Sequence, residues 1–502
     1  MPTEKEIIEA LEKGILLSPK VEEVKTISGE KIEAKGGSRE NSKENNETKV
    51  NSRKTTNENI EGSKEESRYK KYNIEFLKRY EDIFKKRSYH DFFTHFLIRY
   101  KNIENLLKTR TELKSLTSIS RLQNRSEKEN VSIIAMVKDK FETKKGNIRL
   151  IVEDPTGEIS VLLKKNENGK ATTAEDISLD EIIGINGTLG NNIIFSNKIV
   201  HPDIPLTHEL KKHPDEIYAA VLGDMHFGSS VFLQEEFDKL ISWLKGDVGS
   251  DEQKAIAKKI KYIFMIGDLI EGLGIYPGQE EHMDSKFHDI KVQYDLVAEM
   301  LKKIPDDKVI IMCPGNHDYG RLAEPQLPLT SDYSSSIDKI KNVIQVSNPA
   351  FINFAKTEDF PGFNLLMYHG GSLIYYCENV PSIRQAGGQK AVNLTMKYLL
   401  QRRHLAPTHK SNLYIPDPEK DFLFIDTIPD FFVTGHIHRA NIDSYRNVTM
   451  VSGSCWTGKT ENMEKRGLEP QMAKLPVINL RTREIKLINF LKKEHEGVIM
   501  GR

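Results

Sequence analysis

The feature that most constrains this chain is a series of five polar clusters, each placed directly after a short β-rich apolar run. The clusters are Gly223-Asp224-Met225-His226, Gly267-Asp268, Gly315-Asn316-His317-Asp318, His369-Gly370 and Gly435-His436-Ile437-His438. In layered α/β folds, the loops beyond the carboxyl ends of the strands form the ligand site. The order of runs and clusters therefore predicts an α/β domain whose site draws on all five loops.

The sequence from residue 215 onward has the alternation that such a domain requires. Runs typical of strands cover 217–222, 262–266, 309–312, 364–368, 431–433 and 448–451. Helical stretches cover 233–245, 286–303 and 388–403. We therefore expect helices between several of the strands.

The residue types in the clusters point to divalent cations. Carboxylate and imidazole groups suit borderline metals such as Mn, Fe and Zn, and Asp268 could bridge two of them through its two oxygens. Two metals about 4 Å apart clamp the attacking and leaving oxygens of a phosphoryl transfer and lower the pKa of a bridging water. A single Gly-Asp or His-x-His is compatible with an ordinary turn or strand, but the ordered set favours a dinuclear metal site.

The first 125 residues differ from the rest of the chain in apolar content and in charge. Residues 33–68 contain only three apolar residues in 36, too few to offset the chain entropy of folding. Residues 69–125 carry 14 Lys/Arg against 6 Asp/Glu and an apolar helical face that includes Phe92, Phe96 and Tyr100. This basic segment is compatible with a nucleic-acid contact and equally with a solvated helix face.

Residues 126–205 contain five short strand-like runs separated by turn residues. Five strands in so short a stretch suit a small closed barrel of the oligonucleotide/oligosaccharide-binding (OB) type. Such barrels bind single strands by stacking bases on aromatic side chains. Because these strands offer few aromatic residues (Phe141 and Phe195), a protein-contact or scaffold role is favoured over a stacking platform.

Composition excludes several classes of protein. Lys+Arg (73) equals Asp+Glu (73), so a uniformly basic nucleic-acid-binding surface is excluded, although a local patch is not. The three cysteines are far apart, which argues against a zinc ribbon or a disulfide framework. No apolar run is long enough to span a bilayer, and the charged N-terminus lacks a signal-peptide core. We expect a soluble cytoplasmic protein with no membrane association.

The five clusters, in their order, resemble the calcineurin-like metallophosphoesterase superfamily over about residues 215–490. The resemblance implies two packed sheets flanked by helices around a dinuclear centre. One metal would take Asp224, His226, Asp268 and His438, and the other Asp268, Asn316, His369 and His436. His317 would contact the scissile phosphate and protonate the leaving oxygen, with Asp318 orienting its ring. Mn²⁺ is the metal we favour, with Fe, Zn or Mg as alternatives.

A phosphoesterase directly after an OB barrel resembles the B subunits of replicative DNA polymerases. The segments 401–407, 425–430, 432–438 and 453–460 are similar to the small subunit of the archaeal D-family polymerase. This resemblance implies a 3′–5′ proofreading exonuclease that acts on single-stranded or mismatched 3′ ends of DNA beside a large catalytic polymerase subunit. The stretch after Trp456 follows the family only loosely, which leaves the product-side pocket open.

The predicted organisation has five segments. They are an N-terminal helical element (1–26), a disordered linker (27–68), a basic helical segment (69–125), an OB-fold domain (126–208) and a calcineurin-like phosphoesterase domain (209–502). Two other functions stay compatible with the sequence, namely a non-catalytic polymerase scaffold and a stand-alone metallophosphoesterase. Tyr319, Arg321 and Arg384 lie near the clusters and are equally compatible with holding DNA or with ordinary surface positions.

Overall fold

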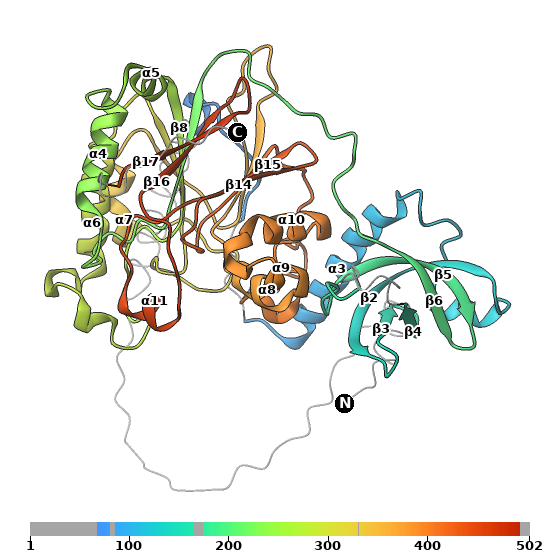
Figure 1. The fold of residues 1–502 in the computed structure, drawn as a ribbon. Coiled ribbons are helices and arrows are strands. Elements are labelled where there is room, and N and C mark those ends of the chain that lie inside the picture. The colour runs from blue at the N-terminus through green and yellow to red at the C-terminus, as the bar shows by residue number, and fades with distance from the viewer. Residues whose placement is uncertain (1–67, 81–85, 165–173, 330, 492–502) are drawn as a thin grey trace, which may run out of the picture. The chain divides into compact units, whose positions relative to one another are not determined.

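The computed structural model describes residues 68–80, 86–164, 174–329 and 331–491 (Figure 1). The helical element predicted over 1–26 lies outside these residues, and so does the linker predicted over 27–68 except for its last residue. The part that is described belongs to one compact unit.

Two six-stranded sheets form the C-terminal region. The first sheet has the order β10-β9-β8-β7-β16-β17, and strands β7 to β10 pair in parallel. Its strands are β7 (Tyr218–Gly223), β8 (Ile260–Ile266), β9 (Val309–Cys313), β10 (Val343–Gln345), β16 (Lys474–Asn479) and β17 (Ile485–Asn489). Parallel pairing places the carboxyl ends of β7, β8 and β9 at one edge of the sheet, as the positions of the polar clusters predict.

The second sheet has the order β1-β11-β12-β13-β15-β14. Its strands are β1 (Glu75–Lys78), β11 (Ala350–Phe354), β12 (Phe363–Tyr368), β13 (Phe431–Thr434), β14 (Asn441–Tyr445) and β15 (Val448–Ser452). Strands β12, β13 and β15 are parallel, so the clusters after β12 and β13 also share an edge.

Side chains that alternate along each strand build a core on both faces of the sheets. In β7, Ala219 and Val221 pack between the two sheets with Phe354 and Phe363. Ala220 and Leu222, which alternate with them, face the helices of the first sheet. The resulting order of layers is helix, sheet, sheet and helix, which confirms the predicted fold class.

Helices cover the outer face of each sheet. Those on the first sheet, at the left in Figure 1, are α4 (Gln234–Lys245), α5 (Asp251–Lys259), α6 (Ile290–Leu301) and α7 (Ser331–Asp338). Those associated with the second sheet are α8 (Leu373–Asn379), α9 (Pro381–Gln385) and α10 (Val392–Arg402). No helix in the described residues is both long and apolar enough to cross a membrane.

The predicted barrel is present as a closed five-stranded sheet with the order β2-β3-β4-β6-β5. Its strands are β2 (Asn130–Glu142), β3 (Ile148–Asp154), β4 (Gly157–Leu163), β5 (Ile182–Gly190) and β6 (Ile193–Val200). Alternate residues such as Ile133, Leu150 and Val161 fill the interior. A buried ion pair, 3.0 Å between Arg402 Nε and Glu181 Oε1, joins the barrel to α10.

Within residues 69–125, which we predict as helical, the described residues are not helical throughout. Glu75–Lys78 form strand β1, because this short segment adds an edge to the second sheet by pairing with β11. The main helix of the segment is α3 (Tyr89–Lys108), and its basic residues are not all on the surface. Arg99 is buried and donates from Nε to Asp421 at 3.0 Å, so α3 is anchored on the C-terminal domain.

Candidate metal centre

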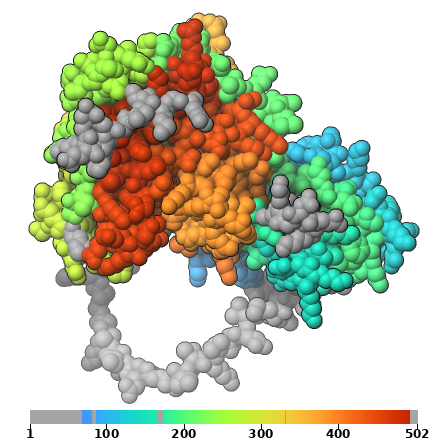
Figure 2. Space-filling model, in the orientation of Figure 1, coloured from blue at the N-terminus to red at the C-terminus, as the bar shows by residue number. Residues whose placement is uncertain are grey.

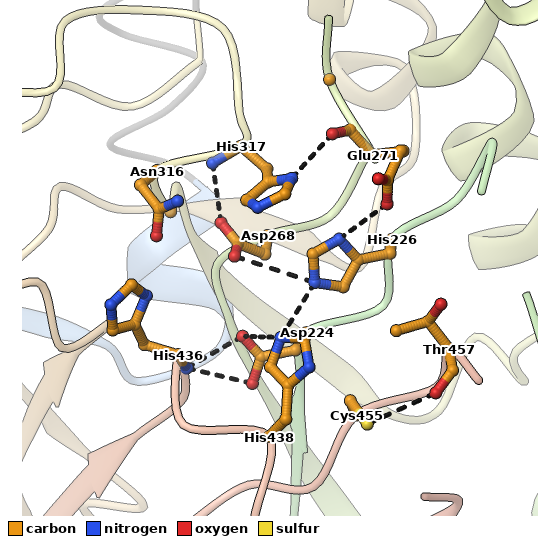
Figure 3. A network of polar contacts seen from close by, with 12 residues as sticks. Asp224, His226, Asp268, Glu271, Asn316, His317, His436, His438, Cys455 and Thr457 are labelled. Carbon is orange, nitrogen blue, oxygen red and sulfur yellow. Dashed lines mark hydrogen bonds and ion pairs between the residues drawn. The ribbon is translucent and has the colours of Figure 1, made fainter. Parts of the chain in front are cut away.

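The seven predicted metal ligands lie together beyond the carboxyl ends of strands from both sheets. Figure 3 labels all of them except His369. One group comprises Asp224, His226, Asp268 and His438, and a second comprises Asp268, His369 and His436. Within each group, one ligand atom from each residue lies within 4.8 Å of the others. Asn316 joins the second group, because its Oδ1 lies 3.0 Å from His369 Nε2.

Asp268 belongs to both groups, and its two oxygens face different partners. Oδ1 lies 3.3 Å from His369 Nε2, and Oδ2 lies 3.8 Å from His226 Nε2. The side chain is almost completely buried. One carboxylate therefore has an oxygen available to each of two cations.

The loops that carry these residues adopt an uncommon backbone conformation. Five of the seven have φ between 48° and 68°, and they are Asp224, His226, Asp268, His436 and His438. In the left-handed region a side chain other than glycine costs on the order of 1 kcal/mol. Such strain concentrated at one edge of the fold is typical of a functional site, where the surrounding packing holds side chains in a required direction.

Glycines allow the loops to approach each other closely. A Cβ on Gly315 would lie 2.2 Å from Asp268 Oδ1, and one on Gly267 would lie 2.5 Å from His369 Nδ1. Real Cβ atoms essentially never come so near another heavy atom. Only glycine therefore fits at these two positions, because any Cβ atom would clash with a predicted ligand.

Hydrogen bonds fix the orientation of two of the imidazoles. The Nδ1 atom of His369 lies 2.9 Å from the carbonyl oxygen of Ile266, and Nδ1 of His226 lies 3.1 Å from Glu271 Oε2. A ring that donates from Nδ1 to an oxygen leaves Nε2 free for a metal. In both rings the Nε2 atom is the one that faces the other predicted ligands.

Glu271 is a residue that the sequence reasoning missed. Its side chain accepts from His226, and its backbone carbonyl oxygen lies 2.7 Å from Nδ1 of His317. Tyr276 and Gln279 in turn donate to Glu271 Oε1 at 3.2 and 3.1 Å. The available signal was an acidic residue three positions after Asp268, but its role depends on contacts with residues far away in the sequence.

Burial sets the charge state of several groups. It raises the pKa of Asp224 to about 7, and it lowers the pKa of His436 to about 3. A neutral imidazole is the form that binds a metal, and a cation would stabilise the buried Asp224 carboxylate. The donor atoms thus fit a pair of divalent metals, since they are carboxylate oxygens, imidazole nitrogens and one amide oxygen. They do not select among Mn, Fe and Zn.

The orientation of His317 differs from our expectation. Asp318 does not hold this ring; its Oδ2 accepts from the backbone of Gly315 at 2.8 Å and of Leu269 at 3.2 Å, and its Oδ1 from Tyr294. Because these donors lie inside the fold, the Asp318 carboxylate points away from the imidazole and braces the loop. The carbonyl of Glu271 orients His317 instead.

Comparison with known proteins agrees with this geometry. Residues 217–440 match the family model of the calcineurin-like phosphoesterases. The DNA polymerase II small subunit of Methanothermobacter thermautotrophicus is 34% identical over 401 residues, which are 80% of this chain and 79% of that protein. The DNA polymerase II small subunit of Archaeoglobus fulgidus is 36% identical over 389 residues, which are 77% of this chain and 74% of that protein.

This chain belongs to the family of DNA polymerase II small subunits. The resemblance inferred from its motifs is therefore confirmed at the level of the family and of the metallophosphoesterase domain. A solved archaeal phosphodiesterase covers 54% of this small subunit at 13% identity, and its TM-score of 0.27 is too low to add to the assignment.

The candidate metal centre of the small subunit opens into a cavity of about 460 Å³, which we call the main hollow. His226, Asp268, His317, His436 and His438 line its floor. Its walls come from the η4 (Gly388–Ala391) region beside α8–α10 and from the segment around α11 (Glu461–Lys465). Figure 2 shows these two segments, orange and red, next to each other on one face. A ligand of nucleotide size can therefore reach the predicted metals.

The other candidates lie elsewhere. Arg321 donates to the carbonyl of Pro325 and stacks on Tyr80, which gives it a structural role. Tyr319 is half-exposed beside Tyr333, with ring centroids 4.0 Å apart. Cys313 is buried in the core between the sheets. Neither Tyr319, Arg321 nor Arg384 lines the main hollow.

Proposed function

We propose that this small subunit is the 3′–5′ exonuclease of its polymerase and hydrolyses the terminal phosphodiester of an unpaired DNA strand with two divalent metals, Mn²⁺ being the favoured ion. The observation that carries the proposal is Asp268, whose two buried oxygens face two separate donor groups. A shared carboxylate between two donor sets is the arrangement that two-metal phosphoryl transfer uses. The first set would be completed by Asp224, His226 and His438. The second set would be completed by Asn316, His369 and His436.

The bound metal pair would supply positive charge to the phosphate oxygens and lower the pKa of a shared water. Water adds to phosphorus, and the bond from phosphorus to the 3′ oxygen of the preceding nucleotide breaks. That oxygen needs a proton, and His317 is placed to provide it. Its ring lies 4.5 Å from the His226 ring between centroids and lines the main hollow.

The surroundings of His317 suit an acid. Its backbone N–H donates to Asp268 Oδ1 at 2.9 Å, so the ring position is tied to the proposed bridging residue. Burial lowers the pKa of His317, so the protonated ring is a stronger acid while the neutral ring is the more abundant form near neutral pH. The Glu271 carbonyl accepts from Nδ1 and leaves Nε2 for the substrate. The names of the relatives support a DNA substrate and a large catalytic subunit as partner.

The test uses a 5′-labelled primer with a mismatched 3′ end on a template, incubated with Mn²⁺ and the small subunit, alone and with its large subunit. We expect stepwise shortening from the 3′ end. Substitution His317→Ala should reduce the rate by about 100-fold or more, the usual contribution of a general acid. His288→Ala, at an exposed histidine outside the main hollow, is the matched control. If the wild-type small subunit leaves the primer intact, both alone and with its large subunit, the exonuclease is rejected and a scaffold role is favoured.

A further inference from the structure

A second cavity lies beside the main hollow. It has a volume of about 400 Å³, and we call it the side hollow. The two cavities share four lining residues, Glu271, Tyr276, Thr460 and Asn462. A molecule held at the metal centre can therefore extend directly into the side hollow.

Three stretches of chain build the side hollow. Ser229, Ser230 and Val231 follow β7 and the first two predicted ligands, and Tyr276, Pro277, Gln279 and Met283 come from around η2 (Gln279–His282). Lys459 to Lys465 close it with α11. The volume falls within the roughly 300–1,000 Å³ of small-molecule sites.

The charges of the two hollows differ. In the side hollow, Lys459 pairs with Glu469 at 3.2 Å and Lys465 with Glu461 at 2.7 Å. In the main hollow, Lys390 and Arg466 have no ion pair or side-chain hydrogen bond to any residue of the described ranges. Arg466 lines the same cavity as the predicted ligands His436 and His438, so its charge lies on the side where the phosphodiester would bind. The unpaired side chains of the main hollow can bind a phosphate. The lysines of the side hollow are already paired with carboxylates, so that cavity suits an uncharged group.

The side hollow also offers an aromatic side chain at the point where the two cavities meet. Tyr276 is partly exposed and lines both of them. Every base has a π face, so stacking on an aromatic ring tolerates any of the four bases. A pocket for a strand end of any sequence needs this kind of contact and not hydrogen bonds that read one base.

We propose that the side hollow binds the 3′-terminal nucleoside of a DNA strand, whatever its base, while the phosphodiester lies in the main hollow near Lys390 and Arg466. The inference rests on the proposed exonuclease function, because it assigns the leaving product as a 5′-mononucleotide. It adds a ligand pocket and a residue, Tyr276, that the metal centre alone does not require.

Binding of the product tests the pocket without catalysis. The Mn²⁺-loaded chain is titrated with dAMP, with dCMP and with inorganic phosphate by calorimetry. Both nucleotides should bind about tenfold or more tightly than phosphate, in line with base stacking on an aromatic ring. Equal affinities of nucleotides and phosphate for the wild type would overturn the pocket, whether or not the protein is a nuclease.

Variants locate the effect. Ser230→Trp should fill the side hollow and remove the preference for nucleotides over phosphate, whereas Ser285→Trp, at an exposed serine outside both hollows, should keep it. Tyr276→Leu should weaken nucleotide binding more than Tyr276→Phe, because phenylalanine loses only the hydroxyl that donates to Glu271. A preference that survives Ser230→Trp would place the nucleoside elsewhere and reject the inference.

Activity separates this inference from the function on which it rests. Ser230→Trp should lower hydrolysis of single-stranded DNA about tenfold more than hydrolysis of bis(p-nitrophenyl) phosphate, a diester without a nucleoside. If wild type degrades DNA and Ser230→Trp lowers both activities equally, the pocket is wrong and the exonuclease stands. If wild type hydrolyses the small diester but never DNA, the exonuclease itself is wrong.

Discussion

The backbone carbonyl oxygen of Glu271 accepts a hydrogen bond from Nδ1 of His317 at 2.7 Å. The same residue accepts from Nδ1 of His226 through its side chain, at 3.1 Å. One glutamate thus orients a proposed metal ligand through its carboxylate and a proposed acid through its backbone. A substitution at 271 separates the two roles, because only the side chain changes.

Glu271→Ala should weaken binding of the first metal by about 10- to 100-fold, the usual effect of removing a group that holds a ligand histidine. Glu271→Gln keeps an oxygen that can accept from His226, so its metal affinity should fall less than that of Glu271→Ala. Metal affinity is measured by competition with a chelator, with Glu280→Gln, at an exposed glutamate in the same region, as control. Unchanged affinity in Glu271→Ala would show that His226 needs no such support.

Gly315→Ala should disrupt the bridging carboxylate, because its Cβ would lie 2.2 Å from Asp268 Oδ1. We expect loss of bound metal and destabilisation of about 1–3 kcal/mol from overpacking. Gly157→Ala is the control, since its Cβ would meet Ile119 at an ordinary 3.6 Å. Metal content and chemical denaturation are measured together. A Gly315→Ala protein that keeps its full metal content would contradict the geometry of the centre.

The sequence predicts the architecture, and it identifies residues that the structure brings together, because apolar runs and polar clusters are local signals. It does not reveal the position of β1, whose four residues become a strand only by pairing with β11. The orientation of Asp318 was also beyond reach, since its partners Leu269 and Tyr294 come from the loop after β8 and from α6. The side hollow joins three distant stretches and leaves no local pattern.

Arg402→Met should destabilise the protein by about 3–5 kcal/mol, the cost of leaving a buried charge without its partner. Arg402 Nε lies 3.0 Å from Glu181 Oε1, and the Glu181 side chain is fully buried between the barrel and α10. Adding Glu181→Leu to Arg402→Met should restore part of the loss. Urea denaturation measures both. Glu181 also accepts hydrogen bonds from the Ser178 backbone and the Tyr398 hydroxyl. A double variant that is less stable than Arg402→Met would show that these bonds outweigh the cost of the unpaired carboxylate.

His404 should make stability depend on pH. Burial, followed by the charge of Arg99, lowers the pKa of His404 to about 4. Its Nε2 lies 2.8 Å from Asp421 Oδ2 and its Nδ1 accepts from the backbone of Ala406, so the folded state holds the neutral ring. A depressed histidine pKa means that the unfolded chain binds the proton first. Stability is therefore complete above about pH 6.5 and falls as the pH drops towards 4.

At pH 5 this histidine should cost about 2 kcal/mol relative to pH 7. The measurement is the difference in unfolding free energy between the two pH values, for wild type and for His404→Gln. The variant should lose about that much less on acidification, whereas His288→Gln, at an exposed histidine, should behave like wild type. Equal pH dependence in wild type and His404→Gln would contradict a neutral buried His404.

The most direct test of the central claim is the chemical identity of what the small subunit releases from a 3′-mismatched primer in Mn²⁺, determined by mass spectrometry. A two-metal centre bridged by Asp268, with His317 protonating the leaving 3′ oxygen, predicts 5′-mononucleotides released one at a time, and none from Asp268→Asn. Inorganic phosphate or free nucleosides in place of 5′-mononucleotides, or equal release by Asp268→Asn, would contradict it.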